Sequence, residues 1–122
     1  PLYSSAASDV YKRQIQRDAS GKRQVRLELN IDLSSMRFEE VEDRHKGRMG
    51  VTVFWSDAKG RPMGHFSDTL DMNMREQTYR RALLEGLPFV APVPFVENGQ
   101  YIKIVIYTYG DDRVGSQTIR LK

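Results

Sequence analysis

The amino-acid sequence predicts a mainly β protein, an antiparallel immunoglobulin-like β-sandwich of about six or seven strands with one short helix. Three observations favour this fold class. Apolar and polar residues alternate in several short runs, as they do in strands with one buried face. Turn-forming residues separate these runs about every 8–12 residues. Helical spacing of apolar residues is confined to one segment near residues 75–85.

The first predicted strand, residues 24–32, alternates polar and apolar residues without an exception. Its apolar face consists of Val25, Leu27, Leu29 and Ile31. A pairing slip of one residue would expose all four side chains, at a cost of about 1.5–3 kcal/mol each. The register of this strand is therefore strongly specified, and its apolar row should form one wall of the core.

Residues 33–46 are interpreted as a polar connection anchored by two apolar side chains, Met36 and Phe38. Phe38 should close one end of the core. The second strand follows at residues 49–55, where strand geometry places four side chains on one apolar face: Met49, Val51, Val53 and Trp55.

A turn at residues 57–60 ends in glycine and leads into the third strand, residues 62–72. Its core contacts should be Phe66, Leu70 and Met72. The apolar spacing then changes from two residues to three and four, which is typical of a helix.

The predicted helix covers residues 75–84, with Tyr79, Ala82 and Leu83 on its apolar side. Gly86 is placed to end it, because glycine readily adopts the left-handed conformation that follows a helix.

The last three predicted segments complete the fold. Residues 87–95 contain three prolines, which lack the N–H group that a strand ladder needs, so this segment should be extended at a sheet edge. Asn98–Gly99 is a strong turn signal. The strand at 101–109 has an isoleucine face and a tyrosine-rich face, and residues 116–121 form the final strand.

The start of the chain differs from the rest. Residues 4–14, SSAASDVYKRQ, resemble the translation of a transposase adapter that is used to prepare DNA sequencing libraries. We therefore expect residues 1–14 to be an artefactual, disordered leader with no part in the fold. Residues 15–122 are expected to form a single β-sandwich domain, a fragment of a longer protein.

Composition excludes several classes of function. The leader holds two of the 19 basic and one of the 16 acidic residues, so the remainder has a formal net charge of +2, which does not indicate nucleic-acid binding. The sequence has no cysteine, which excludes disulfides and thiolate metal ligands. No apolar run approaches the length of about 18 residues that a membrane span needs.

Several motifs follow one another in a characteristic order within residues 24–122. They are WSDAKGRP at 55–62, Phe66, LDMNM at 70–74, Tyr79, Ala82, Leu83, GLPF at 86–89, GQY at 99–101 and DRVGS at 112–116. In this order they resemble the β-rich region that follows the von Willebrand factor type A domain in bacterial VWFA-related proteins. The resemblance implies a C-terminal accessory domain of an exported protein, either periplasmic or extracellular.

The resemblance carries over no binding site. The metal-binding motif of the type A domain, Asp-x-Ser-x-Ser, does not occur in this sequence. One turn departs from the pattern of the family, since Asn98–Gly99 stands where the family has Pro-Gly, and both favour a turn.

Metal sites are not expected. His45 lies in a charged loop and His65 on a strand, and with no cysteine a zinc site would have to be completed by carboxylates. Asp57, Asp111 and Asp112 are turn acids, whose usual role is to bond their own backbone. An alternative is that these three acids gather around calcium.

A nucleophilic site is not expected either. His65, Ser67 and Asp68 are close in sequence, but along one strand His65 and Ser67 point to one side and Asp68 to the other. The base and the acid are therefore not paired locally. We expect no enzyme activity and no cofactor.

The candidate binding surface consists of three aromatic residues, Trp55, Tyr107 and Tyr109. If they share one exposed face, they could stack on sugar rings or contact a protein; alternatively, Trp55 fills the centre of the sandwich. The leading hypothesis is a non-catalytic domain that supports a type A domain expected upstream and binds a protein partner. The alternative hypothesis is a carbohydrate-binding module that uses the three aromatics.

Overall fold

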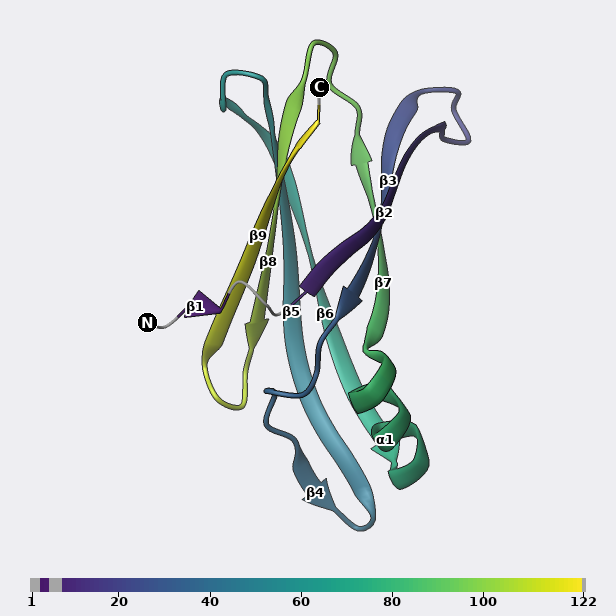
Figure 1. Cartoon of the computed structure of the whole chain (residues 1–122), viewed down its shortest axis with the longest axis vertical. Helices are drawn as coiled ribbons and strands as arrows, with labels where there is room; N and C mark the ends of the chain where they lie inside the picture. Colours follow the sequence, from purple (N-terminus) through teal and green to yellow (C-terminus); the bar gives the residue numbers. More distant parts are fainter. Residues whose placement is uncertain (1–2, 5–7, 122) are drawn as a thin grey trace.

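The computed structural model describes residues 3–4 and 8–121 and consists of two sheets and one helix (Figure 1). The larger sheet contains β1 (Tyr3–Ser4), β4 (Glu39–Val41), β5 (Arg44–Asp57), β6 (Pro62–Arg75), β8 (Gln100–Thr108) and β9 (Arg113–Leu121). The smaller sheet contains β2 (Ser8–Arg17), β3 (Arg23–Ile31) and β7 (Leu87–Pro94). The helix is α1 (Glu76–Glu85).

Every described pairing is antiparallel except that of the two-residue β1 with β9. The larger sheet runs β1-β9-β8-β5-β4, and β6 lies along the other edge of β5. The mainly β fold with one short helix is thus confirmed. The immunoglobulin-like type of sandwich stays a prediction.

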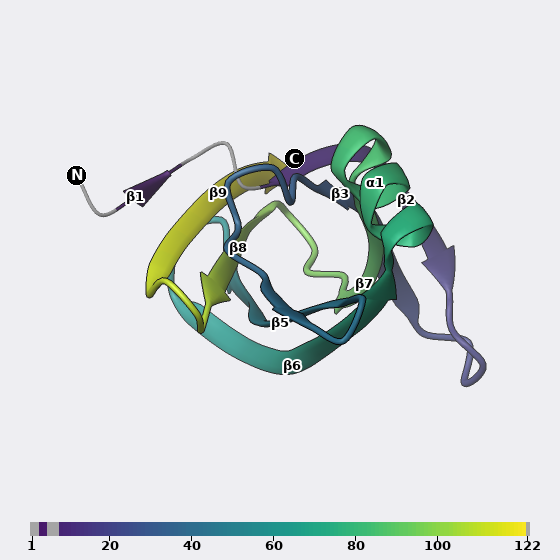
Figure 2. The same cartoon turned by 90° about the horizontal axis from the view of Figure 1, so that it is seen from below.

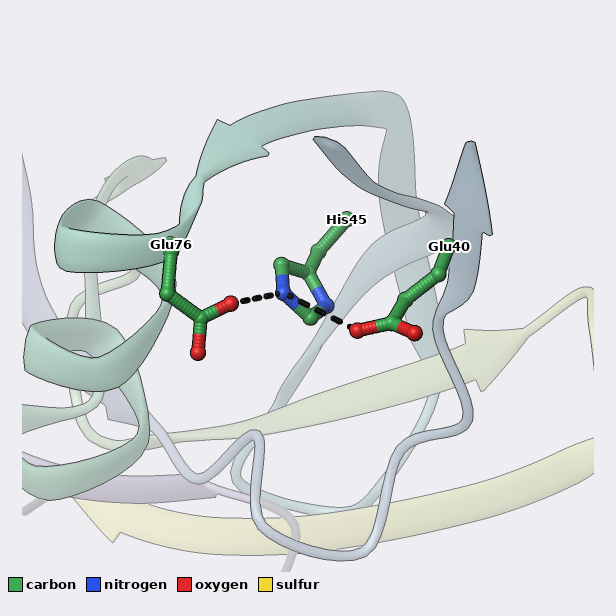
Figure 3. A group of neighbouring side chains, drawn as sticks. All are labelled: Glu40, His45 and Glu76. Carbon is green, nitrogen blue, oxygen red and sulfur yellow. Dashed lines mark hydrogen bonds and ion pairs between the residues drawn. The ribbon is translucent and has the colours of Figure 1, made fainter. Parts of the chain in front are cut away.

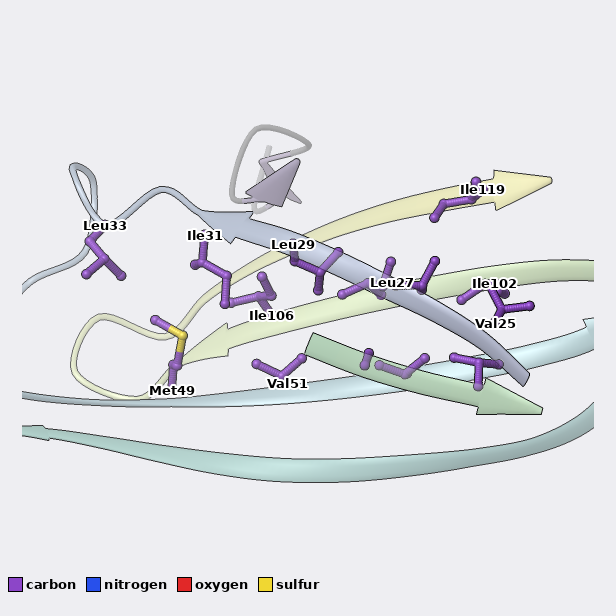
Figure 4. Close-up of a cluster of buried hydrophobic side chains, with 14 residues drawn as sticks. Val25, Leu27, Leu29, Ile31, Leu33, Met49, Val51, Ile102, Ile106 and Ile119 are labelled. Atoms are coloured by element: carbon purple, nitrogen blue, oxygen red, sulfur yellow. The ribbon is translucent and has the colours of Figure 1, made fainter. Parts of the chain in front are cut away.

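The two sheets enclose one apolar core (Figures 2 and 4). Alternate residues of β3 are buried as predicted, and the isoleucine face of β8 belongs to the same cluster. The fully buried side chains come from both sheets: Val25, Leu27, Leu29, Ile31, Ala91 and Val93 from the smaller one, and Met49, Val51, Val53, Ile102 and Ile104 from the larger. The core therefore holds the sheets together by apolar contact.

The segment at 33–46 differs from its prediction as a polar connection. β4 and the first part of β5 form a tight hairpin there, in which Glu39 pairs with Lys46 and Glu40 with His45. Backbone pairing of β5 with β6 extends as far as Arg44. This pairing gives the backbone N–H and C=O groups of the segment their hydrogen-bond partners. The prediction failed because this part of β5 carries charged residues and glycine, so it lacks the apolar alternation that identifies a strand.

α1 lies within one residue of the predicted helix. Arg75 at its N-cap makes no side-chain cap, while Gly86 ends the helix with a φ of 80° and donates its N–H to Ala82. The partly buried Ala82 and Leu83 pack against the core. Within the described part of the chain, no helix has both the length and the apolar character needed to cross a membrane.

β7 is an edge strand whose free side is protected by proline. It pairs with β3 on one side only. Its prolines, Pro88, Pro92 and Pro94, all occupy alternate positions, so the N–H groups they lack are those that would face away from β3. The prediction of an extended edge segment is confirmed, and the missing donors discourage pairing with another chain.

The leader differs in part from its expectation. β2 includes residues 8–14, and it pairs with β3 from Ser8 opposite Ile31 onward. Disorder therefore does not hold for residues 8–14, while residues 1–2 and 5–7 lie outside the described residues. The physical reason is that the edge of β3 offers a row of backbone groups, which an extended segment satisfies whatever its side chains. The resemblance to an adapter stays a prediction.

Replacing Ile104 by alanine tests the assignment of the core face. The side chain is fully buried in the central strand β8, so Ile104→Ala should lower the free energy of unfolding by about 2–5 kcal/mol. Urea denaturation followed by circular dichroism measures the change. The neighbouring Lys103→Ala removes an exposed side chain from the same strand and should change the free energy by less than about 0.5 kcal/mol. Equal losses in the two variants would contradict the assignment.

Candidate functional site

The larger sheet has an outer face, formed by the side chains that point away from the core. In β5, burial of Val51 and Val53 forces Gly50 and Thr52 outward, because successive side chains alternate. Tyr107 of β8 lies directly opposite Gly50, and residues opposite one another share a side of the sheet. Tyr107 therefore lies on the outer face. Tyr109, two positions further along the chain, lies on the same face.

Trp55 lies on the other side of the sheet. It continues the inward row of β5, packs against the core, and has its ring centroid 6.3 Å from that of Phe66. A Cβ atom on Gly64 would lie 2.6 Å from its ring, so the glycine makes room for the indole. The candidate three-residue platform is not formed, because Trp55 is separated by the sheet from Tyr107 and Tyr109. The alternative, in which Trp55 packs toward the core, is the arrangement found.

Tyr107 and Tyr109 remain together on the outer face. Their ring centroids are 5.0 Å apart at an interplanar angle of 85°, an edge-to-face arrangement. Tyr109 is 50% exposed, and a Cβ atom on Gly50 would lie 3.5 Å from its hydroxyl group. The Tyr107 hydroxyl donates a hydrogen bond to Asp112, and this bond, together with burial and the charge of the carboxylate, raises the pKa of Tyr107.

An open groove of about 780 Å³ extends from Tyr109 across β5 and β6. Its other side chains include Arg48 and Asp71, which form an ion pair with Nε and Oδ1 2.6 Å apart. Asn73 and Lys46 continue the lining beyond this pair. We call this feature the tyrosine groove. It combines one half-exposed aromatic ring with charges of both signs and an amide.

The turn acids do not gather around a common point. Asp57 lies opposite Gln100, where β8 begins, whereas Asp111 and Asp112 follow Thr108, where β8 ends. The Asp57 carboxylate accepts hydrogen bonds from the backbone of its own turn. These positions contradict the calcium alternative. Asp57 bonds to its own backbone as predicted, whereas Asp111 and Asp112 accept hydrogen bonds from the hydroxyl groups of Thr108 and Tyr107.

The residues weighed as a nucleophilic set keep the directions that strand geometry requires. His65 and Ser67 lie on the outer face, where the Ser67 hydroxyl is 2.9 Å from that of Thr52 and the His65 ring lies 5.6 Å from Phe54. Asp68 alternates with them and points to the opposite side. The His65 ring and the Asp68 carboxylate therefore lie on opposite sides of β6.

A second group of polar side chains was not predicted from the sequence. His45 is only 6% exposed, and its Nε2 atom lies 2.6 Å from Glu76 Oε2 and 3.6 Å from Glu40 Oε1 (Figure 3). The ring of Tyr79 stacks on the imidazole, with centroids 3.7 Å apart and planes at 7°. We call Glu40, His45 and Glu76 the histidine cluster.

Three elements bring the histidine cluster together. Glu40 of β4 and His45 of β5 are directly opposite in the hairpin, and Met74 of β6 lies opposite His45 on its other side. Glu76 begins α1 two residues later. The hydrogen bond with His45, and secondly that with Arg80, lowers the pKa of the Glu76 carboxyl group.

A sequence signal for this hairpin existed. The acidic pair Glu39–Glu40 and the basic residues Arg44 and Lys46 stand on either side of a two-residue turn, as in a hairpin with opposite charges across its strands. The prediction of a connection over residues 33–46 did not use this charge pattern. It therefore did not identify the residues that contact His45.

The comparisons with known proteins identify no family for this chain. No protein-family model matches the chain, and no curated protein matches it. Among solved structures, it is similar to that of a hypothetical protein from Pyrococcus horikoshii OT3, at 10% sequence identity and a TM-score of 0.49. The similarity covers 98% of this chain and 94% of that protein.

The pKa of Tyr107 provides a test of the outer-face geometry. Asp112→Asn removes the carboxylate that accepts the hydrogen bond of the Tyr107 hydroxyl group, so the pKa of Tyr107 should fall toward its ordinary value of about 10. Ring carbon NMR across a pH titration measures it residue by residue. Asp111→Asn is the matched control and should leave the Tyr107 pKa unchanged. An unaltered value in Asp112→Asn would contradict the hydrogen bond.

Proposed function

We propose that this chain is a non-catalytic interaction domain, which binds a protein partner through the tyrosine groove. The observation that carries the proposal is the position of Tyr109, half exposed at the edge of an open groove on a sheet that the core holds rigidly. Function concentrates in such places because a packed scaffold can present side chains at fixed positions.

The composition of the groove supports a protein partner. Tyrosine and arginine are enriched among the residues that contribute most to protein–protein binding, and charged groups surround such anchors at the rim. Tyr109 provides the aromatic contact, while Arg48 and Asp71 already neutralise each other across β5 and β6. A complementary segment would pack an apolar side chain against Tyr109 and pair its polar groups with Lys46 and Asn73.

The family resemblance supports an accessory role. Most of residues 24–122 resemble the region that follows a type A domain in VWFA-related proteins. In this proposal the partner is such a domain or a protein that it contacts, and the complete protein is exported. No membrane-spanning helix is found among the described residues.

Carbohydrate binding is a second candidate, supported by one specific observation. The Tyr109 ring stands beside Arg48, Asp71 and Asn73, and side chains of these types bond to hydroxyl groups while an aromatic ring covers the face of a sugar. The candidate is weaker because Trp55 lies on the other side of the sheet, and Tyr107 meets Tyr109 edge to face.

Binding measurements with two matched variants test the proposal. Peptides selected from a random display library against the whole chain should bind the tyrosine groove, and Tyr109→Ala should weaken them at least about tenfold, or about 1.4 kcal/mol. Leu84→Ala removes a side chain that is 89% exposed on α1 and should leave their affinity unchanged. Titration calorimetry measures both.

Two outcomes would contradict the protein-binding proposal. The first is a set of selected peptides that bind Tyr109→Ala as tightly as the parent. The second is a glycan array on which the parent binds and Tyr109→Ala does not, with no peptide selected. That second result would favour the carbohydrate candidate.

A further inference from the structure

We propose that Glu40, His45 and Glu76 form a binding site for a divalent transition-metal ion of the zinc class. The site is separate from the tyrosine groove and does not rest on the function proposed for that groove. It also differs from the expectation that the chain has no metal site.

The three potential ligand atoms lie close together. One atom from each residue lies within 4.8 Å of the others, and the imidazole of His45 lies between the two carboxylates (Figure 3). Each residue comes from a different element, so no two are neighbours in sequence. The fold, and not a run of acidic residues, produces the arrangement.

The nitrogen ligand is held in place before any ion binds. His45 is 6% exposed, and the parallel ring of Tyr79 at 3.7 Å fixes the plane of the imidazole. Tyr79 is itself held edge to face by Phe38, with ring centroids 5.1 Å apart. Histidines that bind metals are oriented by such neighbouring groups.

One carboxylate is also oriented. Arg80 donates its Nε–H to Glu76 Oε1 at 2.9 Å, which leaves Oε2 facing His45. Ligand carboxylates in metal sites are commonly held by a hydrogen bond to the oxygen that does not bind the metal. Arg80 is thereby already neutralised by the residue it orients.

A proton on His45 does not account for both carboxylates. The Nε2–H group can donate one good hydrogen bond, which Glu76 accepts, whereas Glu40 at 3.6 Å is beyond hydrogen-bond distance. Within the described part of the chain, no other side chain bonds to the Glu40 carboxylate. A cation bound between Nε2 and Glu76 would also bond to Glu40 once the exposed Glu40 side chain turns toward it.

The distances suit a small cation. Tetrahedral zinc has bonds of about 2.0–2.2 Å, which places its ligand atoms about 3.3–3.5 Å apart. The distance from Nε2 to Glu40 is 3.6 Å already, and the 2.6 Å distance to Glu76 has to widen by less than about 1 Å. Glu40 and Glu76 have exposed side chains that allow this adjustment.

The charge and the ligand type select the class of ion. The two carboxylates give the site a net negative charge even after the ion pair of Glu76 with Arg80, and this charge favours a cation. The imidazole nitrogen favours zinc and its transition-metal neighbours over calcium and magnesium, which prefer all-oxygen sites. Arg44 and Lys46 flank His45, but strand alternation points both away from the site. Three protein ligands leave one position to water.

Metal titration of the untagged full chain tests the proposal. Zinc chloride should bind with a stoichiometry of one by calorimetry, raise the melting temperature, and shift the Nε2 resonance of His45 in nitrogen NMR. Cobalt(II) bound in place of zinc should show the visible absorption bands of a tetrahedral cobalt site. Calcium and magnesium should bind at least tenfold more weakly than zinc.

Glu40→Gln is the sharpest variant, because it removes one ligand from an exposed side chain and leaves the packing of His45 intact. It should weaken zinc binding at least tenfold. Glu39→Gln, the neighbouring acid on the other side of β4, and His65→Ala, the other histidine, should leave zinc affinity unchanged. His45→Gln should abolish binding; if it fails to fold, the His45 resonance of the parent still identifies the ligand.

Three outcomes would overturn the proposal. One is the absence of zinc binding with a Kd below about 1 mM. Another is zinc affinity in Glu40→Gln that equals that of the parent. The third is a His45 Nε2 resonance that zinc does not move while another histidine shifts.

Discussion

Burial of alternate side chains in the central strands is the constraint on which the rest of the structure depends. β5 and β8 each place every second residue in the core against β3, and each fully buried aliphatic side chain contributes about 1.5–3 kcal/mol. Because a strand cannot bury one residue without turning its neighbours outward, the same contacts fix which side chains reach solvent. Tyr107 and Tyr109 lie on the outer face, the first half-buried and the second exposed, because Ile104 and Ile106 are buried.

This constraint also explains which features could be predicted from the sequence. The strand at 24–32 and the isoleucine face of β8 have regular alternation, and their buried faces are those predicted. The helix was predicted from its change of period and from Gly86. Such features depend on the local pattern alone, which a single sequence contains.

Features that depend on the register between strands could not be predicted from the sequence. Trp55, Tyr107 and Tyr109 are all odd-numbered, yet the odd residues of β5 point inward and those of β8 point outward. Only the register of the two strands, in which Gly50 meets Tyr107, decides this. The pairing of residues 8–14 with β3 likewise depends on an available backbone edge.

The β4–β5 hairpin shows how backbone geometry can replace an apolar pattern. Its turn residues, Glu42 and Asp43, have φ values of 48° and 65°, in the left-handed region that costs a non-glycine residue about 1–2 kcal/mol. Backbone pairing beside the turn offsets this cost, because β5 pairs with β4 on one edge and with β6, as far as Arg44, on the other. The sequence contains neither glycine nor asparagine at this turn, so no standard turn signal identifies it.

The same hairpin connects the two candidate sites. Consecutive pairs along it, Glu39 with Lys46 and Glu40 with His45, point to opposite sides, so the first pair lines the tyrosine groove and the second faces α1. The contact of His45 with Glu76 and Tyr79 holds the hairpin against the helix, and thereby sets the position of the neighbouring pair in the groove. One short hairpin therefore supplies side chains to both candidate sites, from its two opposite faces.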